Sequence, residues 1–348
     1  MNGITLEELQ LATRNHGTPL EALRYDVTPL GLHYLLIHYD IPPADPERWR
    51  LRIHGRVRRE LELSLDAVRE RPAAELTVTM ECAGNGRARL DPRPVSQPWL
   101  SEAVGTARWR GVPLRTLLDE AGVADGALEA VFTGADRGIE RGEEQLFRRA
   151  LPLAEASEAI VAYEVNDVPL PPQHGFPLRL VVPGWYGMTN VKWLTDVELT
   201  DTPFGGFQQA RAYRLRVDED DPGEPLRRMR PRALMVPPGI PEFLTRRRTV
   251  NAGTRVLEGR AWSGAPPVTA VDWSADGGRS WTPASLEPER GRWAWRRWTA
   301  TWDAEPGEHE LCCRASDVTG ATQPAEPVWN VGGYANNAIQ RLAVTVVP

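Results

Sequence analysis

The stretch "TVTMECAGNGR", residues 77–87, places a cysteine where an apolar alternation ends and a glycine-rich loop begins. Cys82 is one of 3 cysteines in the chain, and a loop of small residues would leave its thiol accessible. The nearby Arg87 and Arg89 would favour its thiolate, the form that attacks electrophiles and binds metals. The residues alone leave three interpretations open: a half-buried structural thiol, a nucleophile with a base such as His174, or one soft ligand of a metal otherwise held by a cofactor.

A second group of candidate residues lies in "HGFPLRLVVPGWYGMTNVKW", residues 174–193. It combines His174 and Arg179 with Lys192, which is the only lysine among the 41 basic residues of the chain. A guanidinium binds phosphate oxygens bidentately, and an ammonium binds them as a point charge. The segment therefore suits a polar, phosphate-bearing ligand, with an ordinary charged surface loop as the alternative.

Short strands and helices must position these two segments. Strand-like runs over residues 76–81, 159–165 and 177–184 are bounded by Pro, Gly or Asn. Apolar residues at near-helical spacing predict a helix over residues 114–123, where Gly122 marks the end. The first half of the chain is therefore predicted to mix α and β structure.

The composition changes at Asp218, where an acidic, then basic and proline-dense segment begins. Such a segment is typical of a connection between domains. We predict a first domain over residues 1–217, a linker over 218–245 and a second domain over 246–348. Short, regularly spaced strands and the turn sequence "SADGGRSW" predict that the second domain is an immunoglobulin-like β-sandwich. The expected fold class is α+β.

Charge and hydropathy exclude several classes of partner. The formal net charge is −6, and the longest basic run is Arg246 to Arg248, which argues against nucleic-acid binding. No run of eighteen apolar residues and no export signal is visible, so we expect no membrane association and a cytoplasmic location, or a periplasmic one if a leader was removed. Few cysteines, without CxxC or HxxxH spacing, favour a reducing compartment and no structural zinc.

Several motifs together resemble the sulfite oxidase family of molybdopterin enzymes. In the first domain these are "ECAGNGR", "GTARWRGVPL", "VFTGADRG" and "AYEVNDVPLPPQHGFPLRLVVPG". In the second domain "GRAWSG", "SADGGRSW", "WAWRRW", "RASDVTGATQP" and "PVWNVGGYANN" resemble the family's immunoglobulin-like dimerisation domain. The resemblance covers nearly the whole chain, and it implies that the first domain is a molybdopterin-binding catalytic domain.

The resemblance also implies a role for individual residues. Cys82 would be the thiolate ligand of molybdenum, and the pterin dithiolene would supply the remaining sulfur ligands. Tyr213 would be the active-site tyrosine, Arg87 an arginine that neutralises an oxyanion substrate, and Trp99 a wall of the substrate pocket. Cofactor contacts are expected from the segment Tyr34 to His38 and from Asp136, His174, Arg179, Asn190, Val191 and Lys192.

Two departures from the family pattern concern the substrate pocket. The family's Arg-Asn-His stands here as Leu36-Ile37-His38, and a later pocket arginine is replaced near Gly332 in "WNVGGY". Each charge-assisted hydrogen bond contributes about 1.5–3 kcal/mol, so two missing guanidiniums would weaken binding of a doubly charged substrate.

The resemblance implies a molybdenum-cofactor oxidoreductase that transfers an oxygen atom, with oxidation of sulfite to sulfate as the leading expectation. Alternatives are a sulfoxide or N-oxide reductase of the same family, and a cofactor-free dimeric binding module. The sequence contains no CxxCH motif. We therefore expect no haem, electron transfer to a separate protein such as a cytochrome, and a homodimer.

Overall fold

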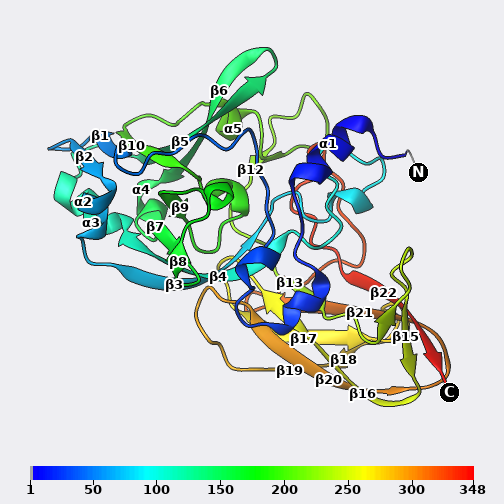
Figure 1. Cartoon of the computed structure of the whole chain (residues 1–348). Coiled ribbons are helices and arrows are strands. Elements are labelled where there is room, and N and C mark those ends of the chain that lie inside the picture. Colours follow the sequence, from blue (N-terminus) through cyan, green and yellow to red (C-terminus); the bar gives the residue numbers. More distant parts are fainter. Residues whose placement is uncertain (1–2) are drawn as a thin grey trace.

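The helices are few and short, and strands make up most of the ordered structure (Figure 1). The computed structural model describes residues 3–348, in which the α-helices are α1 (Leu6–Arg14), α2 (Leu65–Arg69), α3 (Leu114–Ala121), α4 (Leu153–Ala156) and α5 (Phe207–Ala210). α3 confirms the helix predicted from residue 114. Its apolar face is buried, and it ends at Gly122, whose φ of 70° and N–H bond to the Leu118 carbonyl form the cap.

Two sheets form the first region of the chain. One has the order β2-β1-β10-β5-β6, in which β1 and β10 run parallel. The other has the order β3-β4-β7-β8, with β9 also paired to β7. The bounds of the first are β1 (Arg50–Gly55), β2 (Leu61–Ser64), β5 (Glu129–Glu140), β6 (Glu143–Pro152) and β10 (Leu194–Thr200). Those of the second are β3 (Ala74–Glu81), β4 (Val104–Pro113), β7 (Ile160–Val165), β8 (Val168–Pro169) and β9 (Arg179–Val181). The strand-like runs of the sequence correspond to β3, β7 and β9.

Two further sheets form a β-sandwich from the yellow-to-red part of the chain (Figure 1). The first comprises β13 (Arg232–Met235), β16 (Gly253–Trp262), β19 (Ser285–Leu286) and β20 (Arg296–Ala304). The second comprises β14 (Ile240–Pro241), β15 (Arg248–Asn251), β17 (Val268–Ser274), β18 (Thr282–Pro283), β21 (Gly307–Asp317) and β22 (Gln340–Val347). Trp273, Trp298 and Trp302 share one buried cluster with Cys313 and Val344, and this cluster is the sandwich core. The α+β fold class is confirmed.

The segment predicted as a linker, residues 218–245, is more than a connection. A short ribbon joins β11 (Arg214–Leu215) to β12 (Glu224–Pro225), and β13 then pairs antiparallel with β16 as a strand of the sandwich. The prediction was wrong for residues 232–235. The prolines mark the turns on either side of this strand. The four buried residues between those turns pair with β16 in the tertiary structure.

Several chain segments converge on one place between the sheets. β3 ends at Glu81 immediately before Cys82, and β9 begins at Arg179 after the 3₁₀ turn Pro172–His174. The hairpin of β5 and β6 covers a further side. Among residues 3–348, no helix is both long and apolar enough to cross a bilayer.

Candidate active site

Cys82 begins the loop that follows β3, and its backbone N–H donates to the Ala103 carbonyl at 2.9 Å. Asn85 holds the loop closed, because its amide nitrogen donates to the Glu81 carboxylate at 3.0 Å and its amide oxygen accepts from the Ala103 N–H at 3.1 Å. Cys82 is only 8% exposed, so it is largely shielded from bulk solvent, but it lines the cavity described next, where a ligand could reach it. Burial raises the pKa of Cys82, although the charge of Arg87 opposes the shift.

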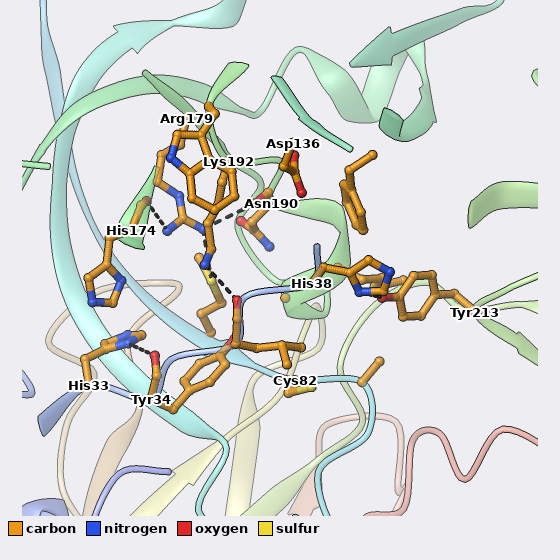
Figure 2. A pocket seen from close by; sticks show the side chains of 17 residues that line it. His33, Tyr34, His38, Cys82, Asp136, His174, Arg179, Asn190, Lys192 and Tyr213 are labelled. Carbon is orange, nitrogen blue, oxygen red and sulfur yellow. Dashed lines mark hydrogen bonds between the residues drawn. The ribbon is translucent and has the colours of Figure 1, made fainter. Parts of the chain in front are cut away.

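A cavity opens beside Cys82, with ≈ 700 Å³ of space that protein atoms do not fill, including its mouth (Figure 2). Most of the predicted site residues line it: Tyr34, His38, Cys82, Asp136, His174, Arg179, Asn190, Lys192 and Tyr213. Arg87, Trp99 and Val191 do not line it. The cavity thus brings together residues that lie far apart in the sequence.

One end of the cavity is cationic. Arg179 is 3% exposed, and its Nη1 donates to the His174 carbonyl at 3.0 Å. Lys192 Nζ donates to the carbonyls of Leu36 at 2.7 Å and Gln173 at 2.9 Å. Burial lowers the pKa of Arg179 to about 10 and, with help from the Arg179 charge, that of Lys192 to about 7. Arg179 therefore remains charged at neutral pH, and a bound anion would favour the charged form of Lys192.

Three buried side-chain atoms of the cavity lining have no hydrogen-bond partner within the described residues: Arg179 Nε, Asp136 Oδ1 and His33 Nε2. Burial raises the pKa of Asp136 to about 6, although the charges of His38 and Lys192 lower it. Burial also depresses the pKa of His174 strongly, so its ring is neutral at pH 7. Unsatisfied buried polar atoms are costly, and a bound polar ligand would satisfy them.

The opposite end of the cavity contains a tyrosine and a histidine. Tyr213 Oη lies 3.3 Å from His38 Nδ1, and His38 Nε2 lies 3.6 Å from Glu140 Oε1. Tyr213 has a left-handed φ of 49°, directly before β11. Burial raises the pKa of Tyr213 well above its usual value, so the phenol is protonated at neutral pH. It can therefore donate a hydrogen bond to a ligand in the cavity.

The three predicted residues that do not line the cavity lie behind its wall. Arg87 Nε donates to the Gly332 carbonyl at 3.0 Å, and its Nη1 donates to the Gln97 carbonyl at 3.3 Å. Trp99 packs in the same apolar cluster as Cys82. Val191 is buried, and its carbonyl accepts the Leu180 N–H at 2.8 Å.

A buried ion pair joins the Cys82 loop to the sandwich. Arg232 Nη1 lies 2.7 Å from Glu81 Oε1, and the Trp262 indole N–H donates to Glu81 Oε2 at 2.9 Å. A backbone bond from Ala335 N–H to the Ala83 carbonyl, 2.8 Å long, adds a further connection. The second region of the chain therefore supports the strand end that carries Cys82.

Sequence reasoning missed several residues of the site. His33 lines the cavity, and burial lowers its pKa to about 4. Gly187 allows close packing, since a Cβ there would lie 2.5 Å from Tyr34 Oη. Arg149 on β6 stacks its guanidinium 5.6 Å from the centre of the Tyr213 ring. His33 adjoins the predicted segment 34–38, whereas no motif in the sequence marks Arg149.

Side chains that could ligate a metal do not form a cluster in the described part of the chain. Among residues 3–348, no group of three or more His, Cys, Asp or Glu side chains could hold a metal ion. A metal at Cys82 would therefore take its other ligands from a cofactor or from solvent. The cavity can combine one soft sulfur ligand with a cationic end that accepts an anionic group.

Two family descriptions match the chain. Residues 38–208 match "Oxidoreductase molybdopterin binding domain", and residues 232–347 match "Mo-co oxidoreductase dimerisation domain". The structure superposes on the sulfane dehydrogenase SoxCD from Paracoccus pantotrophus with a TM-score of 0.81 and 28% identity. That alignment covers 94% of this chain and 84% of the other.

Curated proteins are similar over most of the chain. This chain is 35% identical to mitochondrial sulfite oxidase of Rattus norvegicus over 346 residues, which cover 92% of this chain and 62% of that protein. It is 36% identical to sulfite oxidase of Gallus gallus over 338 residues, covering 90% and 72%. It is 31% identical to NADH nitrate reductase of Solanum lycopersicum over 370 residues, covering 95% and 40%. The chain thus spans 62% of the length of the rat relative.

Proposed function

Because the chain belongs to the sulfite oxidase family of molybdopterin enzymes, we propose that it binds the molybdenum cofactor and oxidises sulfite to sulfate with an external electron acceptor. The observation that carries this proposal is the cavity in which the Cys82 thiol and the cations Arg179 and Lys192 are brought together. Cys82 would hold the metal, and Arg179 and Lys192 would hold the anionic part of the pterin.

The residues present fit such a cofactor. Arg179 Nε and Asp136 Oδ1 are buried and have no hydrogen-bond partner among residues 3–348, so a polar ligand could provide the acceptor and the donor that they need. His174 also lines the cavity, so its neutral ring is available to a ligand. We assign phosphate binding to Arg179 and Lys192, and pterin contacts to Asp136, His174 and Asn190.

When bound, the molybdenum would supply the exchange of an oxygen atom together with a change of two electrons. The protein would hold the metal through Cys82 and keep the thiol away from bulk water, because that side chain is buried. Tyr213 would donate a hydrogen bond from its protonated phenol to an oxygen of the substrate. Glu140, which is partly exposed beside His38, would connect this end of the cavity with solvent.

The test is direct. Protein from a host that makes the molybdenum cofactor should contain molybdenum by mass spectrometry and release a fluorescent oxidised pterin. It should also reduce ferricyanide when sulfite is added, and Cys82→Ala should lose turnover. Protein that contains neither metal nor pterin would instead support a cofactor-free binding module.

A second candidate is reduction of a sulfoxide or N-oxide at the same site. Leu36, which lines the cavity where the family pattern has an arginine, favours it, because a less cationic wall suits a neutral substrate. Turnover of a sulfoxide with reduced viologen, without turnover of sulfite, would select this alternative.

We propose that the chain forms a homodimer and passes its electrons to a separate protein. The match of residues 232–347 to a dimerisation domain supports the dimer. Light scattering during size-exclusion chromatography would test it, since a molar mass near the 38.8 kDa of one chain would contradict it.

A further inference from the structure

Buried arginines divide into two classes in this protein. Those with a relative exposure of 5% or less are Arg87, Arg149, Arg179, Arg232, Arg248 and Arg260. Of these, Arg232 pairs with Glu81 at 2.7 Å, Arg248 with Glu21 at 2.5 Å and Arg260 with Asp26 at 2.9 Å. Within the part of the chain that the structure describes, Arg87, Arg149 and Arg179 have no carboxylate partner.

The three arginines without a carboxylate partner lie in or directly behind the cavity wall. Arg179 belongs to the end assigned to the cofactor. At the other end, the Arg149 guanidinium lies 5.6 Å from the Tyr213 ring centre, and that of Arg87 lies 5.1 Å from the centre of Tyr334. The two tyrosine rings are themselves 5.3 Å apart. Tyr213 lines the cavity and Tyr334 does not, so Arg149 is the cation that packs on a ring of the cavity wall.

Arg149 is the less satisfied of these two cations. It is 1% exposed, its Nη1 donates to the Gln208 carbonyl, and its Nε has no partner among the described residues. Burial lowers its pKa to about 10, which still leaves it charged at neutral pH. An unpaired buried charge destabilises a fold, and an apolar side chain of similar size would cost less. Its presence is explained if an anion binds nearby.

We propose that Arg149 is a positioning residue for the anionic substrate, supplying positive charge at the Cys82 end of the cavity through Tyr213. This inference rests on the proposed function, because it concerns the substrate of that site. The guanidinium attracts the face of the ring and holds the phenol in place. Its positive field also makes the Tyr213 hydroxyl a stronger donor to a sulfur oxyanion. Arg149 thereby supplies part of the positive charge that is missing because Leu36 and Gly332 stand where the family pattern has arginines.

The experiment compares Arg149→Met with Arg149→Lys and with a matched control, Arg260→Met. Arg149 and Arg260 are equally buried at 1%, but Arg260 is paired with Asp26 and lies in the sandwich, away from the cavity. Binding of sulfate to the cofactor-loaded protein is measured by isothermal titration calorimetry. Thermal unfolding without sulfate and molybdenum content are measured on the same samples.

We expect Arg149→Met to weaken sulfate binding about tenfold, the effect of a cation acting through an aromatic ring. We expect Arg149→Lys to bind within about threefold of the wild type, because it keeps the charge. Arg149→Met should not lower Tm, since it removes an unpaired charge, whereas Arg260→Met should lower Tm and leave sulfate affinity unchanged. With sulfite, Arg149→Met should raise KM more than it lowers kcat.

Sulfate binding that is equal in wild type and Arg149→Met, or absent from loaded wild-type protein, would overturn the proposal. So would a drop in Tm as large as that of Arg260→Met, or failure of Arg149→Met to fold, because either assigns Arg149 to the fold. The proposed function fails separately, if loaded protein binds sulfate but does not oxidise sulfite.

Discussion

Replacing Arg232 by methionine is expected to destabilise the chain, because it leaves the Glu81 carboxylate buried without its cation. The two side chains are 4% and 3% exposed, and they meet at 2.7 Å. Removing one partner of a buried ion pair costs about 3–5 kcal/mol. Trp262 and Asn85 would still donate to Glu81. We therefore expect the lower part of this range, about 3 kcal/mol of unfolding free energy.

The assay is a double-mutant cycle with Arg232→Met, Glu81→Gln and the double variant, followed by urea denaturation and tryptophan fluorescence. The double variant should lose about 2 kcal/mol less than the sum of the single losses, since it leaves no unpaired charge. A surface control is Arg52→Met, because Arg52 and Glu60 are 50% and 58% exposed and solvent screens their interaction, so this substitution should change stability little.

Two results would refute this reasoning. One is a loss below about 1 kcal/mol for Arg232→Met, which would make the buried pair equivalent to a surface pair. The other is strict additivity of the single losses, which would mean that the two charges do not interact across the junction. Either result would also remove the explanation for how the sandwich supports Cys82.

Four further predictions concern the site and its surroundings. In cofactor-free protein, stability should rise with pH between about 7 and 10.5, because folded Lys192 releases a proton that the unfolded chain keeps. Measured by urea denaturation, the unfolding free energy of the wild type should increase by at most about 5 kcal/mol over this pH interval, and that of Lys192→Met should increase less. Cys82→Ala should fold and retain pterin fluorescence but lose turnover, and normal activity would exclude the ligand role. Leu36→Arg should lower the KM for sulfite in a steady-state assay. Gly332→Arg should instead lower Tm in a thermal scan, because the Tyr334 ring occupies the space of a side chain at residue 332.

Local sequence patterns were sufficient for the elements that depend on nearby residues. The spacing of Leu114, Leu117 and Leu118 predicts α3, and Gly122 predicts its end, because helix periodicity and capping are local properties. The apolar run before Cys82 likewise predicts β3. In contrast, residues 232–235 were misassigned, since proline density describes the flanking turns and says nothing about the partner strand β16.

Residue types and motifs by themselves determined which side chains of this protein are candidates for chemistry, and most of them line one cavity. Only the tertiary structure decided how they are used. It buries Cys82, turns Arg87 toward the carbonyls of Gly332 and Gln97, and brings Arg149 behind Tyr213. Segments that are far apart in the chain bury these side chains and supply their partners. Desolvation and the charges of the partners then determine the protonation state of each group. No local pattern contains that information.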